Sequence, residues 1–155
     1  MRFESPMLVV ADMEASKAFY ERVLGLRVEV DFGANVTLTG GIALQTLETW
    51  RHFIGAQGDA VRFGGLDKEL YFEEDDFDAF LAHLQSVPEI RLVHPCVEHS
   101  WGQRAVRFFD PDGHVIEVGE DMRAVCRRFV ESGLTPEKTA KRMNVPLSYV
   151  QSCLI

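Results

Sequence analysis

Two glutamates stand inside short apolar segments that have the composition of β-strands. Glu69 opens the segment ELYF, and Glu117 lies within HVIEV. A carboxylate among apolar residues costs free energy unless it is paired, bound to a ligand or turned towards a cavity. Because side chains alternate across a strand, Glu117 shares a face with Val115 and Gly119, and Glu69 shares one with Tyr71. Both glutamates are therefore candidates for a functional site.

Basic side chains could complete such a site, although each also has a structural interpretation. Arg51 and His52 lie in an irregular stretch, where either could meet an anionic group of a substrate or simply be solvated. We expect Arg104 and Arg107 to share one face of a strand, where one of them could pair with Glu117. His114 follows the glycine of a turn and is expected to be structural.

Other common kinds of chemistry have no support in the sequence. There is no GxSxG motif, phosphate-binding loop or GxGxxG motif, so covalent hydrolases, nucleotidases and dehydrogenases are disfavoured. The three cysteines are odd in number and form no CxxC pair, which favours reduced thiols. A net charge of −8 disfavours general binding to nucleic acid or anionic membranes. Without an apparent signal peptide or membrane helix, we predict a cytoplasmic protein.

The elements that must position these residues occur in a repeated order. Residues 1–65 read as strand, helix and three strands, and residues 66–120 repeat that order. Matching Asp12 to Asp76 sets the repeat offset at 64 residues, and Glu48–Gly65 forms a less regular bridge. Repetition of this length indicates two similar modules packed together.

Residues 121–155 differ from the rest of the chain in charge and in periodicity. They carry a net charge of +3, against −11 for residues 1–120. An apolar stripe with helical spacing comprises Met122, Val125, Cys126, Phe129 and Val130. We expect this stripe to be buried on the chain's own sheet or on a partner chain. Residues 134–154 resemble a helix-turn-helix, but Leu147–Ile155 contains no Lys or Arg, so DNA binding is disfavoured. A helical cap or self-association element is the favoured role.

Two segments resemble the vicinal oxygen chelate superfamily, which includes glyoxalase I, extradiol dioxygenases and bleomycin-resistance proteins. They are PMLVVADMEASKAFYERVLGL at 6–26 and WGQRAVRFFDPDGHVIEVGE at 101–120. The resemblance implies an α+β fold in which two βαβββ modules form a cupped mixed sheet, followed here by the helical extension. It also implies a cavity lined by Trp101 and nearby side chains, with Arg51, His52 and His99 as further candidates.

In the metal-dependent members of this superfamily, each module supplies ligands to one divalent ion. The matching positions here are Ser5, Gln45, Glu69 and Glu117. Ser5 departs from the expected ligand, because a serine hydroxyl binds divalent ions weakly. The remaining oxygen donors, Gln45, Glu69 and Glu117, suit Mg²⁺ or Mn²⁺ better than Zn²⁺, with Ni²⁺ as a further option. On this interpretation Glu117 or Glu69 moves the proton.

Two functions consequently stay open. The first is a metal-dependent lyase, isomerase or dioxygenase of glyoxalase type, and the second is a metal-free protein that sequesters a small molecule. The serine at position 5 favours the second, in which no cofactor is present. Members of this superfamily commonly dimerise, so a homodimer is the favoured assembly.

Overall fold

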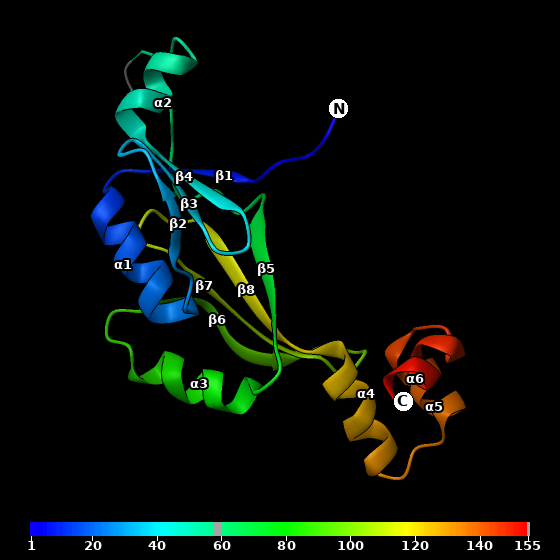
Figure 1. The fold of residues 1–155 in the computed structure, drawn as a ribbon. Helices are drawn as coiled ribbons and strands as arrows, with labels where there is room; N and C mark the ends of the chain where they lie inside the picture. Colours follow the sequence, from blue (N-terminus) through cyan, green and yellow to red (C-terminus); the bar gives the residue numbers. More distant parts are fainter. Residues whose placement is uncertain (58–59, 155) are drawn as a thin grey trace. The chain divides into compact units, whose positions relative to one another are not determined.

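The computed structural model describes residues 1–57 and 60–154 and has the predicted α+β order (Figure 1). The chain divides into two compact units. Unit 1 comprises Met1–Lys68 and Phe109–Val115, and unit 2 comprises Glu69–Phe108 and Ile116–Ile155. The sequence analysis placed a module boundary near residue 65, and the division between the units falls at Lys68.

Unit 1 contains the first βαβββ arrangement. Its elements are β1 (Met7–Val10), α1 (Met13–Leu24), β2 (Val28–Asp31), β3 (Asn35–Leu38) and β4 (Ile42–Thr46). The strands lie in the order β1-β4-β3-β2, with β1 parallel to β4 and the other pairs antiparallel. Asp12 caps α1 by accepting a hydrogen bond from the Ala15 amide. The helix lies along the sheet and buries Phe19, Tyr20 and Val23 (Figure 1).

The bridge contains a helix that the sequence analysis did not predict. Residues Leu47–Phe53 form α2 directly after β4. The helix has seven residues, none fully buried, and its N-cap residue Thr46 makes no side-chain capping bond. Thr46 is a residue type that caps helices, and Leu47 and Trp50 have helical spacing, but a segment this short carries little periodic evidence.

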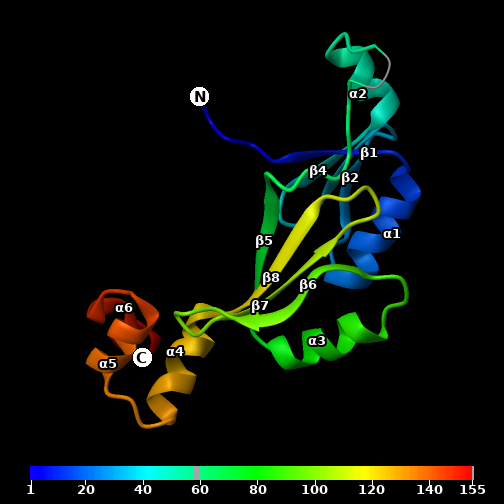
Figure 2. The same ribbon diagram turned by 180° about the vertical axis from the view of Figure 1, so that it is seen from behind.

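Unit 2 repeats the arrangement. It contains β5 (Glu69–Glu74), α3 (Phe77–Ser86), β6 (Arg91–Glu98), β7 (Arg104–Phe109) and β8 (Val115–Glu120), with strand order β5-β8-β7-β6. Helix α3 lies along one face of this sheet (Figure 2), and the rings of Phe80 and Phe108 are 6.4 Å apart. That face therefore holds the apolar core, and the opposite face is free for polar side chains.

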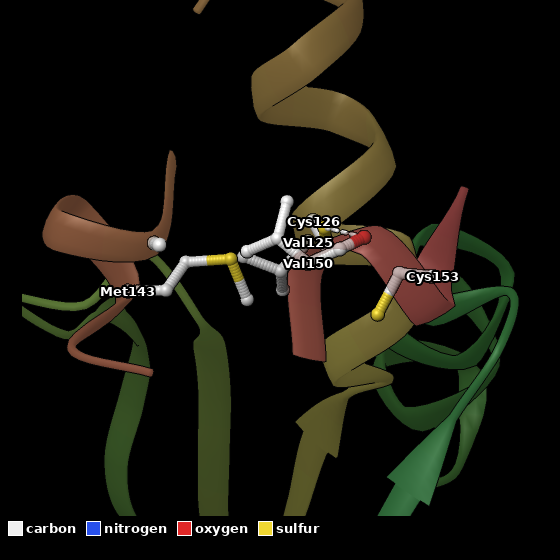
Figure 3. Packing of buried hydrophobic residues seen from close by; sticks show 6 residues of the cluster. Val125, Cys126, Met143, Val150 and Cys153 are labelled. Carbon is white, nitrogen blue, oxygen red and sulfur yellow. Dashed lines mark hydrogen bonds between the residues drawn. The ribbon is translucent and has the colours of Figure 1, made fainter. Parts of the chain in front are cut away.

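Unit 2 also contains the C-terminal helices α4 (Met122–Glu131), α5 (Pro136–Met143) and α6 (Leu147–Cys153). They share a core to which each helix contributes two buried residues (Figure 3): Val125, Cys126, Ala140, Met143, Val150 and Cys153. The stripe of α4 was expected to cover the sheet or a partner chain. In the structure it packs mainly on α5 and α6, and Phe129 reaches Gly102 beyond them. The three helices thus form a small core of their own.

Candidate functional site

Glu69 and Glu117 meet at a single arginine on the face of the unit 2 sheet opposite α3. Arg107 donates from Nε to Glu69 Oε2 over 2.8 Å, and its Nη2 forms an ion pair with Glu117 Oε2. The Glu117 side chain is only 6% exposed, whereas that of Glu69 is 36% exposed. The guanidinium therefore lies between one buried and one accessible carboxylate.

The remaining guanidinium nitrogen of Arg107 contacts a histidine of β6. Its Nη1 lies 3.3 Å from His94 Nε2, and His94 Nδ1 lies 2.7 Å from the Pro95 carbonyl oxygen. A carbonyl oxygen only accepts and a guanidinium only donates, so the imidazole carries its proton on Nδ1 and accepts at Nε2. Each nitrogen of the guanidinium therefore has a partner.

Strand alternation explains why Arg107 is in this position, and it corrects one expectation. Arg104 and Arg107 were expected on one face of their strand. They are three residues apart, so they point to opposite faces. Arg104 binds Asp78 at 2.7 Å and Glu120 at 3.2 Å, beside α3 and α4, while Arg107 turns to Glu69 and Glu117.

Aromatic and amide side chains extend this polar face. The rings of His99 and Trp101 stack with centroids 4.3 Å apart and planes inclined by 11°. Trp101 Nε1 donates to Gln103 Oε1, and Gln103 Nε2 donates to the Tyr71 hydroxyl over 2.8 Å. Tyr71 lies two residues after Glu69 on the same face of β5 and donates to Glu73 Oε1 over 2.8 Å, so the network runs from the stacked rings to β5.

The charges around His99 favour its neutral form. Burial, followed by the electrostatic effects of Arg107 and then of His94, lowers the pKa of His99 below its ordinary value. The stacked pair of rings is therefore an uncharged aromatic surface near neutral pH. Both His99 and Trp101 are partly exposed and remain accessible to a ligand.

The other predicted site residues belong to unit 1. Gln45 is 3% exposed. Its Oε1 accepts from Asn35 Nδ2 over 2.8 Å, and its Nε2 donates to Thr49 on α2. Ser5 lies half-buried in the segment before β1, and Arg51 and His52 lie on α2 rather than in an irregular loop. The structure therefore brings Glu69 and Glu117 together, and His99 and Trp101 together, while Gln45 lies within a local amide–hydroxyl network.

The donor set does not fit a resident divalent metal. The two carboxylates that would bind the ion are already bridged by a guanidinium, and the amide oxygen of Gln45 accepts a hydrogen bond. Residues 1–57 and 60–154 contain no group of three or more His, Cys, Asp or Glu side chains arranged to hold a metal ion. The cation at this position is supplied by the chain itself.

Sequence reasoning missed the central part played by Arg107, and also His94, Tyr71 and Gln103. The available signal was parity within the strand, which places Arg104 and Arg107 on opposite faces. Two carboxylates and one guanidinium give this cluster a net charge of −1. Such a surface can accept hydrogen bonds from a ligand at Glu69 and stack a planar group near Trp101.

Comparison with known proteins supports the fold and the family. The family model described as "Glyoxalase-like domain" matches residues 3–123. A solved structure of a protein of unknown function from Agrobacterium tumefaciens str. C58 is 40% identical, with 79% of this chain and 95% of that chain covered and a TM-score of 0.69. No curated protein matches this chain.

Two further solved structures are less similar in sequence. One, from the mobile metagenome of V. pseudocholerae, is 25% identical, with 78% of this chain and 95% of that chain covered and a TM-score of 0.57. Another is called a glyoxalase/bleomycin resistance protein/dioxygenase family enzyme and comes from Burkholderia phytofirmans PsJN. It is 19% identical, with 76% of this chain and 96% of that chain covered and a TM-score of 0.64, so it supports the fold alone. Across the described residues, no helix combines the length and apolar character needed to cross a membrane.

Proposed function

Because this chain belongs to the glyoxalase-like domain family of the vicinal oxygen chelate superfamily, we propose that it binds a small organic molecule without a divalent metal. The binding surface is the polar face of the unit 2 sheet. The observation that carries this proposal is the position of Arg107, which holds Glu69 and Glu117 where metal-dependent relatives would hold an ion. Sequestration of a ligand therefore takes precedence over lyase, isomerase or dioxygenase chemistry.

The proposed ligand has a planar group and at least one hydrogen-bond donor or positive charge. The stacked rings of His99 and Trp101 offer an aromatic surface for the planar group. Glu69, the more accessible carboxylate, offers an acceptor oxygen beside Arg107. The net negative charge of the cluster disfavours an anionic group at this surface.

Metal content and ligand binding together test the proposal. We expect the purified protein to contain substoichiometric metal by elemental analysis, and its melting temperature to be unchanged by a chelator or by Mn²⁺, Ni²⁺ or Zn²⁺. A library of planar amines should quench Trp101 fluorescence in a Trp50→Phe background, equally with and without chelator. Stoichiometric metal whose removal lowers the melting temperature would contradict the proposal.

Unit 2 supplies the matched variants, and their binding is measured by isothermal titration calorimetry because the Trp101 variants lack the fluorescent reporter. Trp101→Phe keeps an aromatic ring, whereas Trp101→Ala removes the stacking surface. Glu69→Gln removes the charged acceptor from the accessible side of the cluster. We expect Trp101→Ala and Glu69→Gln to weaken binding and Trp101→Phe to retain most of it. Equal binding by all three variants would place the ligand elsewhere.

A further inference from the structure

A second site is present in unit 1, where a buried Asp–His pair adjoins a cavity. His114 was expected to be structural, and its Nδ1 lies 2.8 Å from Asp110 Oδ2. The Asp110 side chain is 0% exposed, and the same oxygen accepts a hydrogen bond from the Tyr20 hydroxyl over 2.9 Å. Asp110 Oδ1 accepts from the amides of Asp112 and His114, at 3.0 and 2.8 Å. These hydrogen bonds engage both oxygens of the Asp110 carboxylate.

This arrangement fixes which nitrogen of His114 is available to a ligand. The Asp110 carboxylate accepts hydrogen bonds from three other donors. It also accepts one from Nδ1 of His114, which therefore carries the ring proton. Nε2 is then the free nitrogen of the ring, whose side chain is 12% exposed. Held in this way, the ring of His114 lines the cavity with Nε2 turned away from Asp110.

His114 lines a cavity of about 180 Å³ between β1 and the segment that precedes β5. One wall is apolar and includes Met7, Val9 and Phe63. The Phe63 ring meets the His114 ring edge-on, with centroids 6.2 Å apart. A cavity of roughly 150 Å³ accommodates benzene in another protein, so this one is suited to a single ring.

The charged residues of the cavity lining all have the same sign. Arg62, Lys68 and His114 line it, and the described lining contains no Asp or Glu. Lys68 has an exposed ion pair with Asp67 at 3.3 Å, which contributes little because both side chains are solvated. In a chain with a net charge of −8, three basic side chains and no acidic one around a cavity are an unusual concentration.

We propose that this cavity binds a small organic anion with a single aromatic ring. The ring packs on the wall formed by Val9 and Phe63, and the anionic group is held by Arg62 and Lys68 beside His114. A carboxylate and a phosphate share this chemistry, since both accept several charge-assisted hydrogen bonds. The site is separate from the one proposed on unit 2, which favours donors and cations.

Three probes of similar size test the charge preference. Benzoate and phenyl phosphate should bind and shift the backbone amide NMR signals of residues 61–65 and His114, whereas benzylamine should not. Tighter binding of phenyl phosphate identifies phosphate as the natural group, and equal or weaker binding identifies carboxylate. Failure of both anions to shift these signals, or equal binding of benzylamine, would overturn the proposal. The amide of Trp101 reports the unit 2 site independently, so failure at one site is distinguishable from failure at the other.

Variants then test the residues. Arg62→Gln and Lys68→Gln should each weaken benzoate binding about fivefold, as expected for a partly solvated ion pair. His114→Asn should weaken it as well, because asparagine can still donate to Asp110 but lacks the ring that lines the cavity. Arg27→Gln, which changes an exposed arginine of unit 1 outside the cavity, is the control and should bind normally. Unchanged affinity in both Arg62→Gln and Lys68→Gln would overturn the assignment even if benzoate binds.

Discussion

At the scale of single residues, the central feature is one arginine that joins two glutamates. Arg107 neutralises half of the negative charge that Glu69 and Glu117 bring together. A buried carboxylate that loses its only cationic partner is strongly destabilising, whereas a complete pair is close to neutral. The guanidinium is thus required by its neighbours whether or not a ligand is bound.

Arg107→Met should destabilise the protein by about 3 kcal/mol, since it leaves Glu117 buried without a cation. Urea denaturation measures this loss, and Arg27→Met at an exposed site should stay within about 0.5 kcal/mol of the parent. The double variant Arg107→Met/Glu117→Gln should recover part of the loss. The freed carboxylates should also let Mn²⁺ raise the melting temperature of Arg107→Met but not of the parent. If Mn²⁺ stabilises the two proteins equally, the guanidinium does not occupy a latent cation position.

The residue types of the site were predictable, but their partners were not. Glu69 and Glu117 stood out because they interrupt apolar strands, and their convergence could be foreseen from the repeat. That Arg107 joins them depends on how β7 pairs with β8, which is a long-range property absent from local periodicity. Alternation along the strand is enough to place Arg104 and Arg107 on opposite faces. The expectation that they share one face was therefore wrong.

At the scale of elements, the join between the sheet and α4 depends on Gly102. Its φ is +91°, and an added Cβ would lie 2.2 Å from Phe129 Cζ. Gly133 has a similar φ of +97° but open space around it. An alanine substitution at Gly133 therefore tests backbone strain alone, whereas the same substitution at Gly102 tests strain together with a steric clash.

Gly133→Ala should cost roughly 1–2 kcal/mol from the left-handed backbone alone. Gly102→Ala should cost about 1–3 kcal/mol more, because the methyl group displaces the Phe129 ring. Chemical denaturation of both variants gives the comparison. Adding Phe129→Ala should relieve the extra cost in Gly102→Ala and none of the cost in Gly133→Ala. Equal losses for the two glycine variants would show that Phe129 moves aside freely.

Glu120 makes the same join sensitive to acid. Burial alone would raise the pKa of Glu120, but hydrogen bonds from Arg104 and Arg128 lower it below its ordinary value of 4.5. Because the folded-state pKa is depressed, this contribution to stability is complete above pH 4.5 and is lost as pH falls through the lowered value. Glu120→Gln should therefore flatten the dependence of unfolding free energy on pH below that point. A parent and a variant with parallel curves between pH 5 and 3 would contradict this assignment.

The elements themselves were largely predictable, since strong periodicity, Asp and Thr caps and turn glycines marked nearly all of them. The seven-residue helix α2 was missed because it buries no residue fully and lacks a capping bond. The packing of the α4 stripe was predicted only in part. An apolar stripe on a helix predicts that the stripe is buried. It does not predict whether α5 and α6 or a sheet will bury it.

At the scale of the whole molecule, the C-terminal helices are tied to the unit 2 sheet by charged contacts as well as by their apolar core. Arg128 Nη2 donates to the Gly102 carbonyl over 2.7 Å and to Glu120 Oε2 over 2.9 Å, and Arg142 Nη1 donates to the Ser100 carbonyl over 2.6 Å. These bonds occupy cations that a DNA-binding role would need. They involve two of the six basic side chains of residues 121–155, and both the prediction against DNA binding and the predicted homodimer stay predictions.

Deleting residues 121–155 should lower stability by about 2 kcal/mol through the loss of the charged hydrogen bonds to Glu120, which corresponds to roughly 5 °C in melting temperature. Calorimetry measures the shift, and size-exclusion chromatography with light scattering shows whether the helices also hold a dimer. Unchanged stability and oligomeric state, combined with salt-sensitive, sequence-selective binding of duplex DNA by the intact chain, would overturn this view of the helices.

The turn that joins β7 to β8 has a consequence for the order of folding. Residues Phe109–Val115 belong to unit 1. There, Asp110 accepts a hydrogen bond from the hydroxyl of Tyr20, which lies 90 residues earlier in the sequence. Until residue 115 has left the ribosome, the buried Tyr20 hydroxyl lacks this acceptor, and unit 1 lacks its segment Phe109–Val115. Contacts of such long sequence separation slow folding. The first module to be synthesised must therefore wait for most of the second before it can be completed.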